Sequence, residues 1–306
     1  MMPQHNRSKT RLVIDAQAIQ GENYDRGIGR YAYSLIHELA NYSQAKITLL
    51  VNSSDLLRHE LVDELVKLYQ LRCIYWDSPI NCRGNGEKAS RDLSSIIYER
   101  TLLSLDGHDA LLIPSICEGF TADCIVSIGK HFQCPLRTIA ICHDIIPIVM
   151  NNRYLSNSPC YEAWYWGCIQ SMQRCNHILT VSKATQRDLV EHLKYPISQT
   201  NVIYADVPIP RRQHTASTSI ELINQVQEQK NILPDKYILA ILGDDPRKNI
   251  DGAIRGYAHA IDLDTGLMQD IHLVIVGSTS AATIERLRGD VDLKDLLSTK
   301  VHFVGR

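Results

Sequence analysis

Short apolar runs alternate with amphipathic stretches along almost the whole chain, and this alternation constrains the fold more than any other feature. The run Leu12–Ala16 is typical of a strand, and Gly27–Asn41 carries apolar residues at helical spacing. The pattern continues as far as Asn201–Tyr204 and resumes at Tyr237. Strands that alternate with helices predict a parallel sheet with both faces covered, so we expect an α/β fold.

The other elements of the first part follow the same pattern. Further strands are expected at Ile47–Val51, Leu71–Trp76, Ala110–Ile113, Thr138–Cys142 and Ile178–Val181. Further helices are expected at Leu56–Tyr69, Ser90–Leu105, Tyr161–Arg174 and Lys183–Leu193. Ser182 has the residue type and the position of an N-cap for the last helix. Together these elements predict one Rossmann-like domain.

The segment Pro208–Gln229 interrupts the alternation and has the composition of a linker. We therefore expect an N-terminal domain over residues 1–207, a linker over 208–233 and a partial C-terminal domain over 234–306. The second domain offers strands at Tyr237–Leu242, His272–Gly277 and Lys300–Val304. Three such strands are half of a doubly wound domain, so we expect the second domain to be incomplete at Arg306.

Length and composition indicate an ordinary globular protein. A chain of 306 residues can form about two domains. Its apolar content of 44% and charged content of 22% are typical of soluble proteins. The formal net charge of −2 argues against nucleic acid as a partner, because such binding depends on an excess of positive charge.

The sequence carries no recognisable targeting or metal-binding signal. Residues 1–11 lack the apolar core of a secretory signal, and no apolar run approaches the ~20 residues of a membrane span. The nine cysteines include no C-x-x-C pair and fit no zinc template. We expect a cytoplasmic protein with reduced thiols and no metal site. Peripheral association with the inner face of a membrane is left open.

Two cations, Arg247 and Lys248, lie at a predicted strand-to-helix turn. The apolar run Tyr237–Gly243 before them is typical of a buried strand, and an amphipathic helix begins near Asn249. The first N–H groups of a helix have no partner inside it, so cations beside them favour an anionic phosphate. The alternative is a solvated surface pair, which is the usual fate of such residues.

The helix at Gly27–Asn41 begins with the pattern G-x-G-x-x-A, in which Gly27 and Gly29 supply the glycines. A dinucleotide fingerprint requires the strand to lead almost directly into the glycines, whereas Gln17–Asp25 intervene here. The acidic residue expected after the next strand is also absent, since Asn52 stands there. We expect either a ligand-facing loop or simply a tight helix start.

His143 and Asp144 end a predicted strand of the sheet, and the carboxyl ends of strands are where such folds bind ligands. A histidine there can hydrogen-bond a sugar hydroxyl or a phosphate, and Asp144 can orient its ring. The alternative is a satisfied loop histidine. Glu118 follows another strand, and as a lone loop carboxylate it is expected to be solvated.

These segments together resemble the family 4 glycosyltransferases, which are retaining enzymes of GT-B architecture. The resemblance is strongest to bacterial mannosyltransferase-like members that build polysaccharides and lipopolysaccharide O-chains. It is carried by Ile14–Asp15 with Arg26–Tyr31, Ile141–Pro147, Thr180–Thr185 and Gly243–Asn249. The last of these is the most specific, because Pro-Arg-Lys-Asn between a strand and a helix marks the family's donor domain.

The resemblance implies two Rossmann-like domains that face each other, with the acceptor bound mainly by the first and the nucleotide-sugar by the second. In the family, the glycine loop and the Arg/Lys pair bind the donor diphosphate. Those residues would be Gly27, Gly29, Arg247 and Lys248 in this chain. The family's histidine lies beside the transferred sugar, which assigns catalysis to His143 with Asp144. Such enzymes generally need no metal or other cofactor.

Two departures from the family pattern stand out. Gly243 is followed by Asp244 where many members have an arginine, so one phosphate-binding cation is missing. The family's acidic motif would lie beyond Arg306, so the resemblance is to a C-terminally truncated member. Glu118-Gly119-Phe120 matches part of that motif by letters only, in the wrong domain.

The sequence thus predicts a retaining glycosyltransferase that moves a mannose-like hexose from a nucleotide-sugar donor to a glycan or lipid-linked glycan acceptor. One alternative is a non-catalytic remnant or interaction subunit that needs a partner chain to complete the donor domain. A second alternative is a nicotinamide-dependent oxidoreductase, against which the long segment before Gly27 argues.

Overall fold

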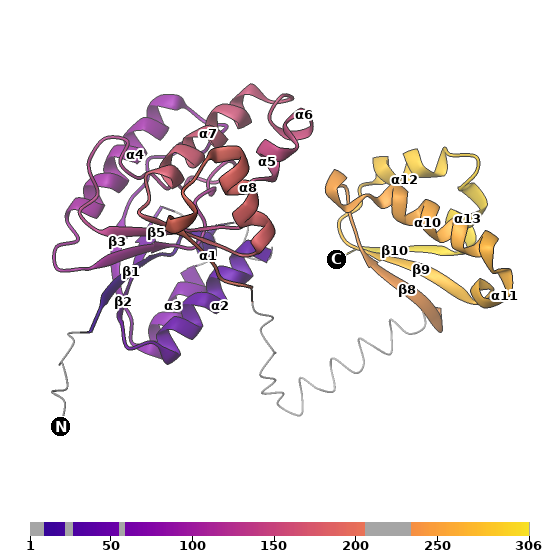
Figure 1. Cartoon of the computed structure of the whole chain (residues 1–306), viewed down its shortest axis with the longest axis horizontal. Helices are drawn as coiled ribbons and strands as arrows, with labels where there is room; N and C mark the ends of the chain where they lie inside the picture. Colours follow the sequence, from indigo (N-terminus) through magenta and orange to yellow (C-terminus); the bar gives the residue numbers. More distant parts are fainter. Residues whose placement is uncertain (1–8, 22–26, 55–58, 206–233, 306) are drawn as a thin grey trace. The chain divides into compact units, whose positions relative to one another are not determined.

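The computed structural model describes residues 9–21, 27–54, 59–205 and 234–305 (Figure 1). The chain divides into two compact units, residues 1–209 and 210–306. The expected linker over 208–233 lies outside the described residues, so the predicted domain boundaries stay a prediction. Each unit is a separate α/β structure.

The described part of unit 1 contains a seven-stranded parallel sheet with the order β3-β2-β1-β4-β5-β6-β7. Its strands are β1 (Arg11–Asp15), β2 (Lys46–Asn52), β3 (Arg72–Trp76), β4 (Ala110–Ile113), β5 (Arg137–Cys142), β6 (His177–Thr180) and β7 (Thr200–Val202). The order changes direction between β1 and β4, which is the topological switch point of a doubly wound sheet. The predicted Rossmann-like fold is therefore confirmed for this unit.

Helices cover both faces of this sheet (Figure 1). They are α1 (Gln17–Gln20), α2 (Gly27–Tyr42), α3 (His59–Tyr69), α4 (Lys88–Leu103), α5 (Ile146–Val149), α6 (Asn151–Tyr154), α7 (Pro159–Gln173), α8 (Lys183–Leu193) and the 3-10 turn η2 (Ile197–Gln199). One apolar core joins the sheet to α4 and α7 through Tyr98 and Tyr165, and another joins it to α2 and α3 through Ile36 and Leu65. Two separate cores are what a sheet with both faces covered requires.

Buried polar groups fix the loops at the carboxyl edge of this sheet. Asp15 ends β1 and accepts hydrogen bonds from the Tyr98 hydroxyl at 2.6 Å and the Gln17 amide at 2.9 Å. Burial raises the pKa of the Asp15 carboxyl, although these bonds partly offset the effect. Gln17 also donates to the Ile125 carbonyl at 2.8 Å and accepts from the Ile125 amide at 3.0 Å. The loops after β1 and β4 are thereby held together.

The described part of unit 2 has a three-stranded parallel sheet of order β10-β9-β8. Its elements are β8 (Lys236–Ile241), the 3-10 turn η3 (Pro246–Lys248), α10 (Ile250–Leu263), α11 (Thr265–Met268), β9 (Ile271–Val276), α12 (Ala281–Arg288), α13 (Lys294–Thr299) and β10 (Val301–Gly305). Figure 1 shows α10, α12 and α13 along the same face of this sheet. The arrangement follows from right-handed crossovers that all proceed in one direction along the sheet.

The expectation that the strand before Arg247 is buried is wrong. In the described unit, Tyr237 is 45% exposed, Leu239 55% and Ile241 70%. Ile238, on the other face of the strand, is also 46% exposed, whereas Ala240 packs into the core under the helices. The apolar run correctly predicted a strand, but apolar composition does not reveal that β8 is the edge strand of the described sheet.

Candidate functional site

His143 directly follows β5 and is held on two sides. Its Nε2 lies 2.9 Å from the Pro114 carbonyl oxygen, and its ring meets the Tyr31 ring edge-on with centroids 5.2 Å apart. A carbonyl can only accept, so Nε2 carries the proton and the neutral ring presents Nδ1 as an acceptor. Burial lowers the pKa of His143, while the Pro114 carbonyl and Asp144 act against that shift. The imidazole is therefore neutral at pH 7.

The backbone around His143 is tied to the next strand's loop. The Asp144 carboxylate accepts from the Ile146 amide at 3.0 Å, where α5 begins. The Thr185 hydroxyl donates to the His143 carbonyl at 3.1 Å, and Ser182 caps α8 by accepting from the Thr185 amide at 3.0 Å. The predicted N-cap at Ser182 is confirmed, and the cap also positions the loop that carries His143.

Two groups that we did not expect also hold the ring of His143, because its Nε2 donates to the Pro114 carbonyl and its edge meets the Tyr31 ring. The expected role of Asp144 in orienting the ring stays a prediction. Pro114 directly follows β4. Its carbonyl reaches His143 because β4 and β5 are neighbours in the sheet, a relationship that strand spacing alone does not reveal.

The structure brings the predicted glycine loop to the same edge as His143. Gly27 is the first residue of α2, and a side chain added there would meet nothing within 4 Å. Gly29, two residues into the helix, is buried. Tyr31, two residues later, makes the ring contact with His143. The start of α2 and the end of β5 are therefore in contact through Tyr31 and His143 within unit 1.

Arg247 and Lys248 lie in the η3 turn of unit 2 and differ in their surroundings. Asp245 accepts from the Arg247 amide at 3.0 Å and from its guanidinium Nε and Nη2 at 2.9 and 2.5 Å. Lys248 is exposed, and within the described residues its ammonium forms no ion pair or hydrogen bond. Asn249, at φ 46°, caps α10 by accepting from the Gly252 amide at 3.3 Å. Lys248 is thus the cation that a ligand can reach without displacing Asp245.

Asp244 ties two loops of unit 2 together. Its carboxylate accepts from the Ser280 amide at 3.0 Å, and its own amide donates to the Ser278 carbonyl at 3.2 Å. Gly277 has a φ of +139°, and a Cβ there would lie 1.8 Å from the Leu242 carbonyl oxygen. The loops after β8 and β9 can therefore close only around glycine at position 277.

The predicted site residues fall into two groups. Gly27, Gly29, His143 and Asp144 belong to unit 1, and Arg247 with Lys248 belongs to unit 2. Their meeting at one donor site stays a prediction.

We expected the Glu118 carboxylate to be solvated, and this expectation is wrong. Its exposed fraction is 4%. The neighbouring Gly119 has a φ of +90°, and a Cβ there would lie 2.0 Å from the Cys124 carbonyl oxygen. The loop after β4 folds back tightly on itself, and this close packing buries Glu118.

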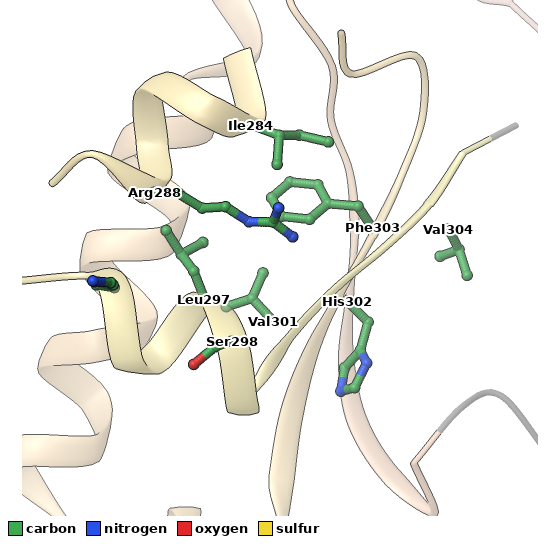
Figure 2. A pocket seen from close by; sticks show the side chains of 9 residues that line it. Ile284, Arg288, Leu297, Ser298, Val301, His302, Phe303 and Val304 are labelled. Atoms are coloured by element: carbon green, nitrogen blue, oxygen red, sulfur yellow. The ribbon is translucent and has the colours of Figure 1, made fainter. Parts of the chain in front are cut away.

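A groove of about 630 Å³ lies in unit 2 (Figure 2). It is lined by α12, α13 and β10 through Ile284, Arg288, Lys294, Leu297, Ser298, Val301, His302, Phe303 and Val304. None of the sequence-predicted site residues lines it.

The described residues contain neither a cluster of metal ligands nor a helix suited to cross a membrane. Across them, no three His, Cys, Asp or Glu side chains are grouped closely enough to hold a metal ion. No helix in the same ranges has the length and apolar character needed to cross a membrane.

Comparison with known proteins places this geometry in context. No protein-family model matches the chain. The serotype-specific mannosyltransferase WbdA of Escherichia coli is 24% identical over 307 residues, which covers 96% of this chain and 35% of WbdA. Another WbdA sequence is 25% identical over 223 residues. The chain thus spans about a third of the length of this curated relative.

Solved structures share the fold. Anabaena HepE, in complex with UDP and glucose, superposes with a TM-score of 0.55 at 13% identity, over 97% of this chain and 69% of HepE. A trehalose 6-phosphate synthase from Burkholderia multivorans superposes with a TM-score of 0.54 at 10% identity, over 98% and 74% of the two chains. This likeness shows that the chain has a GT-B-like fold, and over nearly its whole length the sequence is similar to the mannosyltransferase WbdA.

Proposed function

We propose that the chain is a retaining glycosyltransferase acting in polysaccharide or lipopolysaccharide biosynthesis. It would move a mannose-like hexose from a nucleotide-sugar to a glycan or lipid-linked glycan acceptor. The observation that carries the proposal is the neutral His143 at the carboxyl edge of the unit 1 sheet, in a chain similar to a mannosyltransferase over 96% of its length. The structures in complex with UDP support a nucleotide-sugar as the donor.

The proposed chemistry is a front-face displacement. The bond between the sugar's anomeric carbon and the diphosphate oxygen breaks, and the acceptor oxygen bonds to that carbon on the same face. The acceptor proton passes to the departing diphosphate. His143 Nδ1 accepts a hydrogen bond from a sugar hydroxyl and so positions the ring. Lys248, Arg247 and the free amides at the start of α10 stabilise the negative charge that develops on the leaving group.

Lys248 offers the sharpest test of the donor site. We expect Lys248→Ala to reduce release of nucleoside diphosphate from GDP-mannose or UDP-glucose by roughly tenfold or more, because a charge-assisted contact is lost. Lys67→Ala, which removes an exposed cation on α3, is the matched control. Unchanged turnover in Lys248→Ala would remove the phosphate role from this residue.

Location follows from the substrates proposed. Nucleotide-sugars and reduced thiols fit a cytoplasmic enzyme, and a lipid-linked acceptor would bring it to the inner face of a membrane as a peripheral protein. Sedimentation with inner-membrane vesicles, at low and at high salt, tests the peripheral association. Salt releases peripheral electrostatic contacts, so the bound fraction should fall at high salt.

One observation favours the alternative of an interaction subunit. In the described part of unit 2, β8 is an edge strand, and the backbone groups along such an edge are a template for pairing with further polypeptide. Its side chains Tyr237, Leu239 and Ile241 are exposed as well, so a partner chain that pairs with the edge and packs on this face would cover both. Light scattering after gel filtration, combined with a transfer assay on the same fractions, distinguishes the two: activity in a monomeric fraction would contradict the need for a partner.

A further inference from the structure

The groove between α12, α13 and β10 combines an apolar floor with positive charge. Val301 and Leu297 are buried at its base, and Ile284 and Phe303 are half-buried along its sides. Figure 2 shows the side chains of Ile284, Arg288, Leu297 and Phe303 directed into the same space. At about 630 Å³ its volume falls within the range of small-molecule sites.

The lining of this groove contains cations and no carboxylate. Arg288 and Lys294 line it, and neither forms an ion pair within the described residues. No aspartate or glutamate is among the lining residues. On the same helix, by contrast, Arg286 is paired with Asp251 at 2.7 Å and is not part of the lining. An arginine with uncompensated charge beside apolar side chains favours an anion that brings its own apolar portion.

We propose that this groove binds a phosphorylated amphiphile, a single molecule with a phosphate head and an aliphatic chain. The phosphate contacts Arg288 and Lys294, since a guanidinium can donate two parallel hydrogen bonds to phosphate oxygens and an ammonium adds a point charge. The chain lies along Ile284, Leu297 and Phe303. An aliphatic chain gains from covering such surface in proportion to its buried area.

A phosphate head explains the charges better than a carboxylate or a neutral sugar head. A phosphate monoester carries about −1.5 to −2 charges at pH 7, which the two cations of the lining match. The site lies within residues 281–305, and its occupancy is measured without donor or turnover. The binding test is therefore independent of the proposed transferase activity.

The test uses the full chain and monododecyl phosphate below its critical micelle concentration, with binding followed by calorimetry. Dodecyl maltoside supplies the same chain with a neutral head, and inorganic phosphate supplies the head alone. We expect one-to-one binding of dodecyl phosphate, with each control ligand roughly tenfold weaker or worse. Arg288→Ala and Lys294→Ala should each weaken binding by about tenfold. Arg286→Ala, the same change on the same helix outside the groove, should not.

Backbone amide shifts in a nitrogen-15 spectrum locate the ligand. Shifts confined to residues 284–304 support the site. The proposal is overturned if dodecyl maltoside binds as tightly as dodecyl phosphate, if Arg288→Ala binds like the unaltered chain, or if the shifts lie elsewhere. Association with intact phosphatidylglycerol vesicles in the absence of monomer binding would overturn it as well, because the groove would then be a contact for a membrane surface.

Discussion

The guanidinium of Arg247 is held by the carboxylate of Asp245, through Nε and Nη2 at 2.9 and 2.5 Å from Oδ2. The cation proposed to bind a diphosphate therefore already has an anionic partner two residues away. A phosphate that approaches Arg247 meets the negative charge of Asp245 as well. The unpaired Lys248 beside it carries no such cost, which gives the two cations of one turn different roles.

This ion pair predicts an unusual direction for a substitution at Asp245. We expect Asp245→Asn to tighten binding of UDP or GDP by about two- to fivefold, because repulsion of the phosphates falls while the side-chain oxygen still caps the Arg247 amide. The control is Asp251→Asn, which disrupts an ion pair between Asp251 on α10 and Arg286 on α12. Calorimetric titration checks it. Weaker binding in Asp245→Asn would mean that the carboxylate positions Arg247 for the ligand.

The tautomer of His143 predicts how activity depends on pH. The protonated ring carries hydrogens on both nitrogens, so Nδ1 cannot then accept from a sugar hydroxyl. Burial lowers the pKa of His143 from its ordinary 6.5, so the neutral form persists below that pH. We expect turnover to be constant above pH 6.5 and to fall as the pH drops through the lowered pKa. His143→Gln should lose at least about tenfold in turnover and show no such fall.

Tyr31 predicts a change in that pKa. Its ring meets His143 edge-on, so Tyr31→Ala would admit water to the imidazole and relieve the desolvation that lowers the pKa. The His143 pKa should then rise toward 6.5, as followed by the imidazole proton resonances. The lowered pKa also makes the stability of the folded protein depend on pH. A buried neutral histidine contributes stability above its unfolded pKa, and that contribution is lost as the pH falls through the lowered pKa. An unshifted titration would show that Tyr31 does not shield the ring.

Glu99 predicts an acid-sensitive anchor in unit 1. Its buried carboxylate accepts from the Ser127 hydroxyl at 2.6 Å and from the amides of Lys130, His131 and Phe132 at 2.8, 2.7 and 2.7 Å. Burial opposes ionisation, but these four hydrogen bonds outweigh it and lower the pKa. Stability from this group is therefore present above pH 4.5 and is lost as the pH falls through the lowered pKa.

Glu99→Gln should consequently lower the free energy of unfolding by about 1–3 kcal/mol at pH 7, since one carboxylate oxygen that accepts is replaced by an amide that donates. Urea denaturation at pH 7 and pH 4 measures the free energy of unfolding of both proteins. We expect the difference between them to be smaller at pH 4. Glu64→Gln, on the exposed side of α3, should change little. Equal losses at both pH values would contradict the ionised state of Glu99.

The fold of unit 1 could be predicted because its determinants are local. Periodicity located its strands and long helices, and the Ser182 cap set the start of α8, whose bounds Lys183–Leu193 were predicted as found. The site could be predicted only in part. His143 was placed correctly at a strand end, but its contact with Pro114 depends on which strands are neighbours. Likewise, the pairing of Arg247 with Asp245 depends on backbone angles in a short turn that spacing does not reveal.

The face of β8 predicts that apolar residues in one strand differ sharply in their contribution to stability. Leu239 is 55% exposed in the described unit, whereas Leu273 on the neighbouring strand is 3% exposed beneath the helices. We expect Leu239→Lys to change the free energy of unfolding by less than about 0.5 kcal/mol, and Leu273→Ala to cost about 2–5 kcal/mol through a cavity. Thermal and urea unfolding of both variants measure the difference. A large cost for Leu239→Lys would show that further polypeptide covers this face in solution, which is the outcome that an interaction subunit requires.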